Sequence, residues 1–334
     1  MLIKDKEKFF SKPWVVCVCA IICCLLWGSA FPCVKLGREW FMIDEDSIPS
    51  LMLFAGLRFT LAGVFVIVFG CITQRRFLVP KPRNIWRVLV VALFQTVLQY
   101  TFFYIGVNHT YGVKSAVLNG LGVFFTILGA CFIFRTEKFN WIKLLGCVLG
   151  FGGIIIINIG GEFNFEFTFM GEGCVILSGL SAAIAAGFVK VFSKAEDTTA
   201  LCGYQFFIGG LVLVAIGLIF GGTIPHIDVR AAFMLIYLAF LSACAFTLQG
   251  YLLRYNPVSK VAVYKSTNPL FGAMFSAIIL EEYDQLLNWF TIPAIVLVCL
   301  GIFVINVFGE RKKKAPPPPP PPASSNSYIP ASKA

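Results

Sequence analysis

The stretch VAVYKSTNPLFGAMFSAIIL, from Val261 to Leu280, carries polar and helix-breaking residues inside an otherwise apolar run. These residues are Lys265, Ser266, Thr267, Asn268 and Pro269. A lysine in hydrocarbon costs roughly a few kcal/mol, and a proline releases the carbonyl four residues before it from its helical hydrogen bond. Such groups could bind a polar solute if the segment crosses a membrane and its polar half faces a cavity.

Glutamines and aromatic residues in other apolar stretches could serve the same chemistry. Gln95 and Gln99 are four residues apart and share one face of a helix, and Gln249 stands in a similar LQ context to Gln99. Buried amides either join neighbouring helices or line a cavity. We expect cavity lining. Trp27 and Tyr264 could form aromatic walls for an organic solute, although packing is the commoner role of aromatic side chains.

Basic side chains in the apolar stretches would suit a different solute. Arg58 stands in the middle of one stretch, where it either pairs with a helix-end carbonyl or a glutamate, or attracts an anion. Lys114 stands near the start of another stretch and is expected at the membrane interface. Together with Lys265, these residues could serve an anion of the sugar-phosphate or nucleotide-sugar type.

Motifs of enzyme chemistry are absent from the sequence. It has no phosphate-binding glycine loop and no nucleophile elbow, and its only histidines are His109 and His226. The twelve cysteines show no paired CxxC spacing near a histidine, so we expect them to act as small apolar filler. We therefore expect no enzyme activity, no cofactor and no metal site.

Composition defines the class of protein. Of 334 residues, 58% are hydrophobic and only 13% are charged, and the mean hydropathy is +0.83. A soluble domain usually carries about a quarter of its residues as Asp, Glu, Lys and Arg. The chain is therefore expected to be an all-α integral membrane protein.

The apolar stretches are close to the ~20 residues that a helix needs to cross the hydrocarbon core of a bilayer. We expect ten of them, at Trp14–Val34, Leu51–Cys71, Arg87–Tyr104, Val113–Phe134, Trp141–Ile159, Gly173–Val191, Ala200–Phe220, Ala231–Leu253, Val261–Leu280 and Trp289–Val307.

The net charge of +10 is distributed as a membrane topology requires, so it gives no reason to expect nucleic acid. With the N-terminus in the cytoplasm, Lys and Arg collect in the inner segments, whereas the outer loops are acidic, as in Asp44–Asp46 and Glu281–Asp284. This bias predicts an even number of spans, a multi-pass protein of the plasma or inner membrane, and cytoplasmic termini.

Three pairs of short motifs recur in the same order at a spacing of about 150 residues. They are AFPCVK and AAGFVK, LQY and LQG, and GGIIIIN and LGIFVIN. Five spans are an odd number, so the second half must be inverted relative to the first. We expect two inverted five-helix repeats. The chain then divides into a cytoplasmic N-terminal segment, the two repeats and a tail, at 1–12, 13–159, 160–308 and 309–334.

These motifs resemble the EamA-type permeases of the drug/metabolite transporter superfamily. The resemblance rests on WGSAFPCVK, LRFTLAG, TEKFNWIKLLGCVLGFGGIIIIN, YQFFIGG and YKSTNPLFGAMFSAIILEE. It implies a ten-helix carrier of small metabolites such as amino acids, or of amphipathic toxic compounds, most often exported. Glu137 and either Glu281 or Glu282 stand where the family has an acidic residue after the fourth helix of each repeat. The proline that the family has in the fourth span is replaced by NGLG (119–122).

The two halves carry helix-weakening residues at matching positions. NGLG aligns with STNP, so Gly120 and Gly122 correspond to the region of Pro269. Paired interruptions of this kind point to a binding site near the membrane midplane. We therefore expect Asn119 to join the solute-binding residues. That predicted set is Trp27, Gln95, Gln99, Asn119, Gln249, Tyr264, Lys265 and Asn268, with hinges at Gly120, Gly122 and Pro269.

The sequence thus favours a secondary transporter that exports small metabolites by alternating access, with proton coupling undecided and a homodimer allowed. An organic-anion carrier is one alternative. A non-transporting scaffold is another, because the tail holds seven consecutive prolines (316–322) that a proline-binding module could read.

Overall fold

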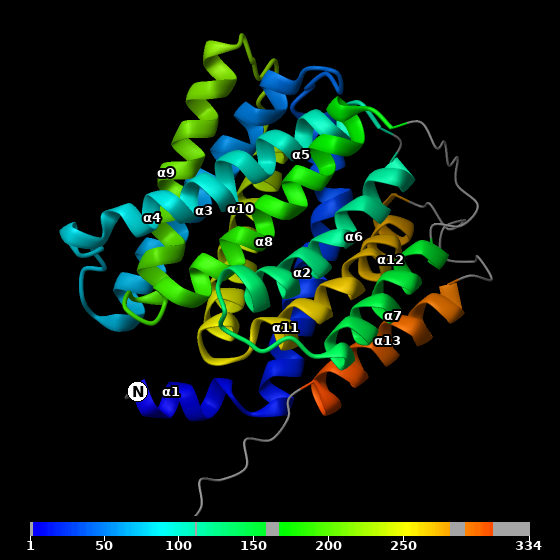
Figure 1. The fold of residues 1–334 in the computed structure, drawn as a ribbon. Coiled ribbons are helices and arrows are strands. Elements are labelled where there is room, and N and C mark those ends of the chain that lie inside the picture. The colour runs from blue at the N-terminus through cyan, green and yellow to red at the C-terminus, as the bar shows by residue number, and fades with distance from the viewer. Residues whose placement is uncertain (1–2, 111, 158–166, 281–290, 310–334) are drawn as a thin grey trace, which may run out of the picture.

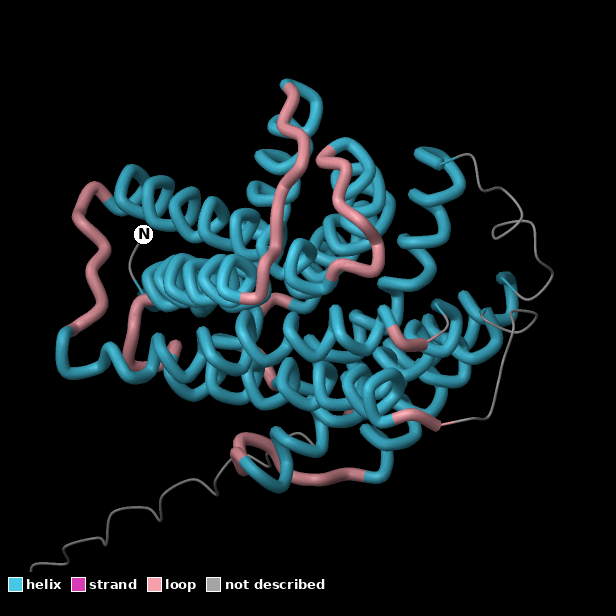
Figure 2. The backbone as a smooth tube through the Cα atoms, turned by 90° about the horizontal axis from the view of Figure 1, so that it is seen from above, coloured by secondary structure: helices cyan, strands magenta, loops and turns pink. Residues whose placement is uncertain are grey.

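The computed structural model describes residues 3–110, 112–157, 167–280 and 291–309, and within these ranges the regular structure is entirely helical (Figure 2). The α-helices are α1 (Ile3–Phe10), α2 (Pro13–Trp40), α3 (Ile48–Gln74), α4 (Ile85–Ala92), α5 (Gln99–Asn108), α6 (Gly112–Leu128), α7 (Trp141–Ile157), α8 (Cys174–Phe192), α9 (Thr198–Ile219), α10 (Val229–Tyr255), α11 (Val258–Ala262), α12 (Asn268–Leu280) and α13 (Thr291–Phe308). Short turns of 3-10 helix (η1, Pro82–Asn84; η5, Val263–Thr267) and π-helix (η2, Leu93–Leu98; η3, Gly129–Ile133; η4, Phe169–Gly173) extend or join them.

Six helical segments are long and apolar enough to cross a membrane. They are Pro13–Trp40, Ile48–Gln74, Pro82–Asn108, Phe169–Phe192, Thr198–Ile219 and Val229–Tyr255. Shorter apolar helices cover Leu118–Ile133, Trp141–Ile156 and Ile292–Phe308. The prediction of an all-α membrane protein is therefore confirmed, with six clear spans in the described part of the chain.

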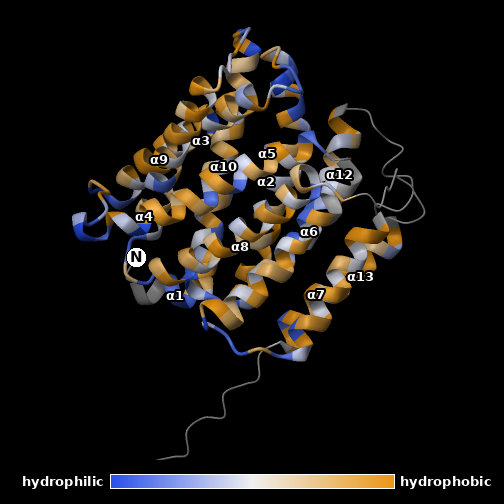
Figure 3. Cartoon of the chain, turned by 45° about the horizontal axis from the view of Figure 1, so that its top comes forward, coloured by the Kyte–Doolittle hydropathy of each residue, from blue (hydrophilic) through white to orange (hydrophobic). Residues whose placement is uncertain are grey.

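The outer surface of the bundle is apolar, as lipid contact requires. Exposed side chains include Phe69, Trp141, Ile219 and Phe233, each more than half exposed. Figure 3 shows hydrophobic residues along the lengths of the helices and hydrophilic residues gathered at loops and helix ends. In water such a surface would be unfavourable, whereas in hydrocarbon it costs nothing.

Glycines bring α3 and α9 into backbone contact. A β-carbon at Gly63 would lie 2.4 Å from the backbone nitrogen of Phe207, and one at Gly56 would lie 2.5 Å from that of Val214. The two helices therefore run antiparallel and pack along most of their lengths. Small residues permit such close approach of membrane helices.

The helices α7 and α13 form a second close pair, which lies apart from α3 and α9 in Figure 1. A β-carbon at Gly153 would lie 2.8 Å from the carbonyl oxygen of Ala294, and one at Gly146 would lie 2.9 Å from that of Gly301. Between the two pairs, α2 packs against α10 and α12, and α8 packs against α5 and α6.

The opening stretch of the sequence does not form one continuous α-helix. The chain passes from α11 through the 3-10 turn η5 and begins a new helix, α12, at Asn268. Pro269 therefore lies in the first turn of α12, where its missing N–H leaves no hydrogen bond unmade. The interruption that Pro269 predicts is present, but it precedes the proline as a 3-10 turn.

Gly120 and Gly122 lie within the continuous helix α6, and the irregular turn of that segment is η3, further along the chain. A β-carbon at Gly120 would lie 2.8 Å from Ile154 Cδ1, and Gly122 faces Gly179 of α8. In this conformation both glycines serve close helix packing. Their role as hinges stays a prediction.

Candidate functional site

A small cavity of about 20 Å³ lies inside the bundle, between the α4–η2 segment and α8, α9 and α10. Its lining residues are Val91, Gln95, Val189, Thr198, Leu201, Cys202, Gln205, Phe246, Gln249, Gly250 and Leu253. None of these side chains is charged, and three are glutamines. A volume of this size holds water-sized molecules, because one water needs about 10–15 Å³ on this measure. The cavity is therefore too small for a molecule the size of an amino acid in this conformation.

Gln205 is the most deeply buried polar residue of the lining, with no exposed surface. Its Oε1 accepts a hydrogen bond of 2.9 Å from Thr96 Oγ1, whereas its Nε2 has no partner among the described residues. Gln249 is also buried, and Gln95 is half-buried. Three amide groups from η2, α9 and α10 therefore meet at one cavity, and at least one of their donors is unpaired.

Aromatic rings close one side of the cavity. Phe246 lines it directly, and Trp27 of α2 meets the Phe246 ring edge-on, with centroids 4.4 Å apart. The ring of Phe206, from α9, also contacts the Phe246 ring, with centroids 4.6 Å apart. Amide donors beside an aromatic wall can bind a solute that has both a polar and an apolar part.

The structure separates the predicted site residues into different places. Gln95 and Gln249 line the cavity, and Trp27 backs its aromatic wall. Gln99 is half-buried and Asn119 is exposed, and neither belongs to the lining. Gln99 and Asn119 are therefore not part of the candidate site.

Tyr264, Lys265 and Asn268 lie at η5 and the start of α12, next to α2 and away from the glutamine cavity. The backbone carbonyl of Tyr264 accepts hydrogen bonds from Cys24 Sγ (3.2 Å) and Thr267 Oγ1 (2.7 Å). Asn268 Oδ1 is buried without a partner among the described residues. The polar turn thus forms a second polar region inside the bundle.

Arg58 is 3% exposed, and its Nε donates to Ser242 Oγ of α10 at 2.9 Å. Its guanidinium lies 4.9 Å from the centre of the Phe59 ring. Within the described residues it forms no ion pair. The partner is therefore a hydroxyl, instead of the expected glutamate or helix-end carbonyl.

Gln205 was not among the residues predicted from the sequence, yet a signal for it exists. LRFTLAG and YQFFIGG place Arg58 of α3 and Gln205 of α9 at corresponding positions, each followed directly by a phenylalanine. Both side chains bond a hydroxyl on a distant helix, Ser242 for Arg58 and Thr96 for Gln205. The repeat therefore relates two polar positions that differ in charge.

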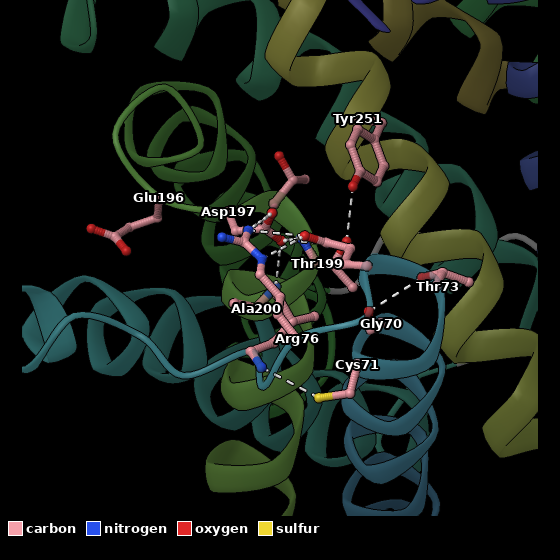
Figure 4. Close-up of polar contacts among 12 residues, drawn as sticks. Gly70, Cys71, Thr73, Arg76, Glu196, Asp197, Thr199, Ala200 and Tyr251 are labelled. Carbon is pink, nitrogen blue, oxygen red and sulfur yellow. Dashed lines mark hydrogen bonds and ion pairs between the residues drawn. The ribbon is translucent and has the colours of Figure 1, made fainter. Parts of the chain in front are cut away.

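A polar cluster lies at the start of α9, where Thr198 lines the cavity, and Figure 4 shows Arg76, Asp197 and Thr199 of this cluster. Asp197 Oδ1 accepts from the backbone nitrogens of Thr199 (2.9 Å) and Ala200 (3.1 Å), and so caps the N-terminus of α9. Its Oδ2 pairs with Arg76 Nη2 at 3.3 Å. The neighbouring Glu196 pairs with Arg87, with 3.6 Å between Nη1 and Oε1. The cluster joins the end of α3 and the start of α4 to the α8–α9 loop.

Glu137, in the loop between η3 and α7, forms a second tie between distant segments. Its carboxylate accepts hydrogen bonds from Lys143 Nζ (2.5 Å), from the backbone nitrogen of Ser259 (3.0 Å) and from Ser259 Oγ. Burial alone would raise the pKa of Glu137, but the hydrogen bonds and the lysine charge outweigh it and lower that pKa. Glu281 and Glu282, the other acidic residues expected at such positions, lie outside the described residues, as does the side chain of Lys114.

The described helices are apolar on their outer surface and enclose an amide-lined cavity, as in a polytopic membrane protein. The chain belongs to the EamA-like transporter family, whose model matches residues 14–159 and 169–307. It is thus a membrane transporter of the drug/metabolite transporter superfamily.

Individual relatives agree with this class. The chain is 27% identical over 299 residues to an uncharacterized transporter of Synechocystis sp., covering 82% of this chain and 86% of the relative. It is 23% identical over 285 residues to the uncharacterized inner membrane transporter YedA of Escherichia coli (strain K12), covering 83% and 88%. A crystal structure with 14% identity has the same fold, with a TM-score of 0.72 over 88% of this chain and 96% of that one.

Proposed function

We propose that this protein is a secondary transporter that moves small neutral or zwitterionic metabolites, and exports them by alternating access. The observation that carries the proposal is the cavity where Gln95, Gln205 and Gln249 meet. Its lining is uncharged and partly aromatic, which suits amino acids and related amphipathic compounds better than strongly charged solutes.

A ten-span arrangement of two inverted five-helix repeats is part of the proposal. The family model matches the chain twice, once in each half. Helices at corresponding positions also pack against each other: α3 with α9, and α7 with α13. The first helix of each proposed repeat also makes matching contacts with the other repeat. Helix α2 contacts α10 and α12, and its counterpart α8 contacts α5 and α6. Contacts that recur between corresponding helices support a two-fold relation between the halves.

Contacts between the first and second halves occur near both ends of the helices, which supports a closed conformation. At one end, Arg87 pairs with Glu196 and the backbone nitrogen of Ser259 donates to Glu137. At the other, Thr110 Oγ1 donates to Glu172 at 2.5 Å. Alternating access would break one of these sets at a time, and the small cavity would then enlarge.

We place both termini in the cytoplasm and the protein in the plasma or inner membrane. The support is the charge distribution: basic residues are concentrated in the segments expected on the same side of the membrane as the N-terminus. A single cysteine at position 81, in a variant without the twelve native cysteines, tests this orientation. A membrane-impermeant maleimide should label it only after the cells are permeabilised. Labelling in intact cells would mean that the orientation is the opposite of the proposed one.

Transport is tested with purified protein in liposomes loaded with a mixture of amino acids and common metabolites. Efflux is followed by mass spectrometry, with and without a pH gradient, which also tests proton coupling. We expect selective efflux of one neutral or zwitterionic class. If no solute leaves faster than from protein-free liposomes, the proposal is wrong.

An organic-anion carrier is the second candidate, and the observation that favours it is Arg58. This buried cation has no ion pair within the described residues, and Lys265 is a second basic residue inside the bundle. Arg58→Gln keeps a donor for Ser242 and removes the charge. Efflux of anions only, lost in Arg58→Gln and in Lys265→Ala, would establish this candidate in place of the first.

A further inference from the structure

We propose that Gln205 is a solute-binding residue, whose Nε2 donates a hydrogen bond to an uncharged acceptor oxygen of the transported molecule. The acceptor would be an amide, a carbonyl or a hydroxyl oxygen. This inference rests on the proposed transport function and specifies which part of the solute the cavity binds.

The Gln205 amide is held in one orientation. Thr96 Oγ1 donates to Gln205 Oε1 at 2.9 Å, and both residues have no exposed surface. Gly209, one helical turn after Gln205, allows this contact because a β-carbon there would lie 2.6 Å from Thr96 Cβ. With Oε1 engaged by Thr96, Nε2 is the amide atom left for a ligand in the cavity, whose lining includes Gln205.

A buried amide donor without a partner is unfavourable, because it loses its hydrogen bonds to water and gains none in return. Gln205 Nε2 is such a donor among the described residues. A site built to bind a polar ligand carries this cost in the empty protein and recovers it when the ligand's acceptor arrives. The donor therefore has the properties of a specificity-determining group.

The surroundings of Gln205 define the chemical class of the acceptor. The cavity lining holds no charged side chain, and its other polar groups include the amides of Gln95 and Gln249. A carboxylate or phosphate placed there would lose its hydration without a counter-ion, which is costly. An uncharged oxygen needs only the hydrogen bond that Gln205 offers, and the neighbouring Phe246 ring suits an adjacent apolar part.

The alternative is that a single bound water satisfies Gln205 Nε2 and that the residue has a structural role only. Pairs of similarly shaped amino acids distinguish the two: asparagine and leucine, glutamine and methionine, threonine and valine. One member of each pair has the acceptor oxygen in its side chain and the other lacks it. KM and kcat for efflux from liposomes would be measured for all six, in the wild type, in Gln205→Met and in Gln99→Met as the matched control.

In the wild type we expect a lower KM for the acceptor-bearing member of at least one pair, by about 10-fold. Gln205→Met should abolish that preference by raising the KM of this member alone, with kcat nearly unchanged. Gln99→Met should keep the preference. The melting temperature of Gln205→Met should change little, because the variant removes a buried unpaired donor but also the acceptor of the Thr96 hydroxyl.

Four results would overturn the inference. An equal change of KM for both members in Gln205→Met, or a lowered melting temperature with the preference intact, would assign Gln205 a structural role. A wild type that transports these amino acids without any preference within the pairs would overturn the inference alone. A wild type that transports no solute at all would overturn the proposed transport function, and the inference with it.

Discussion

The rings of Phe59 and Phe206 stack, with centroids 5.3 Å apart and an angle of 9° between their planes. Phe59 also contacts Tyr100 at 4.4 Å, and Phe206 contacts Phe246 at 4.6 Å. Four rings from α3, α5, α9 and α10 therefore form one cluster in the middle of the bundle. Because Phe246 also lines the cavity, the cluster connects the contact between α3 and α9 to the proposed solute site.

Gln249→Ala and Gln99→Ala form a matched pair for testing the cavity. The sequence repeat relates the two residues, but only Gln249 lines the cavity. We expect Gln249→Ala to raise the KM for efflux by about 10-fold, because one hydrogen bond to the solute is lost. Gln99→Ala should change the KM by less than about 2-fold. The measurement is efflux from liposomes under initial-rate conditions. Equal effects of the two substitutions would contradict the placement of the site.

Gly63→Val should destabilise the protein, because its β-carbon would overlap the backbone of Phe207. We expect the free energy of unfolding to fall by about 2 kcal/mol or more, measured by thermal unfolding in detergent. Gly129→Ala is the control. Outside the neighbouring residues and backbone of its own helix, no atom lies within 4 Å of its β-carbon position, so the change should be neutral or slightly stabilising. A Gly63 variant as stable as the wild type would mean that α3 and α9 are further apart.

Glu137→Gln tests the buried tie between the η3–α7 loop and Ser259. The side chains of Glu137 and Lys143 are 7% and 6% exposed, so the variant leaves the lysine buried without its counter-ion. Breaking such a pair costs about 3 kcal/mol, and the melting temperature in detergent should fall accordingly. Glu45→Gln is the control, because Glu45 pairs with Arg38 but is 70% exposed, and exposed pairs contribute about 0–1 kcal/mol. Similar effects in both variants would contradict the burial of Glu137.

The lowered pKa of Glu137 also predicts a pH dependence of stability. A carboxyl whose pKa is lower in the folded than in the unfolded state stabilises the protein fully above the unfolded value of about 4.3. That contribution is lost as the pH falls below this value and through the lowered folded pKa. We therefore expect the difference in melting temperature between the wild type and Glu137→Gln to be constant above about pH 5.5 and to shrink below pH 4. A difference that grows on acidification would reverse the sign of the shift.

The class of protein could be predicted from composition, and some residues of the candidate cavity from residue type alone. Gln95 and Gln249 were identified because amides are rare inside apolar helices, and both line the cavity. Gln205 was missed because the sequence does not reveal which neighbour takes up its hydrogen bonds. Its unpaired donor appears only when Thr96 is seen to bind the other end of the amide.

The sequence repeat relates residues of the two halves but does not determine what surrounds each side chain. Gln99 and Gln249 correspond in sequence, yet only Gln249 belongs to the cavity lining. The α-helix is interrupted by the 3-10 turn η5, directly before Asn268 and Pro269, and the sequence could not show the form of this interruption. Local propensity locates such a break, whereas packing decides its form.

The glycine contacts between α3 and α9 limit how the protein can move. With backbones this close, neither helix can tilt away from the other without losing contacts along much of its length. We therefore expect the pair to act as a pivot that stays together through the transport cycle. In the proposed alternating-access cycle, the other cavity helices, α4, α8 and α10, would then move relative to this pair to open space for a solute.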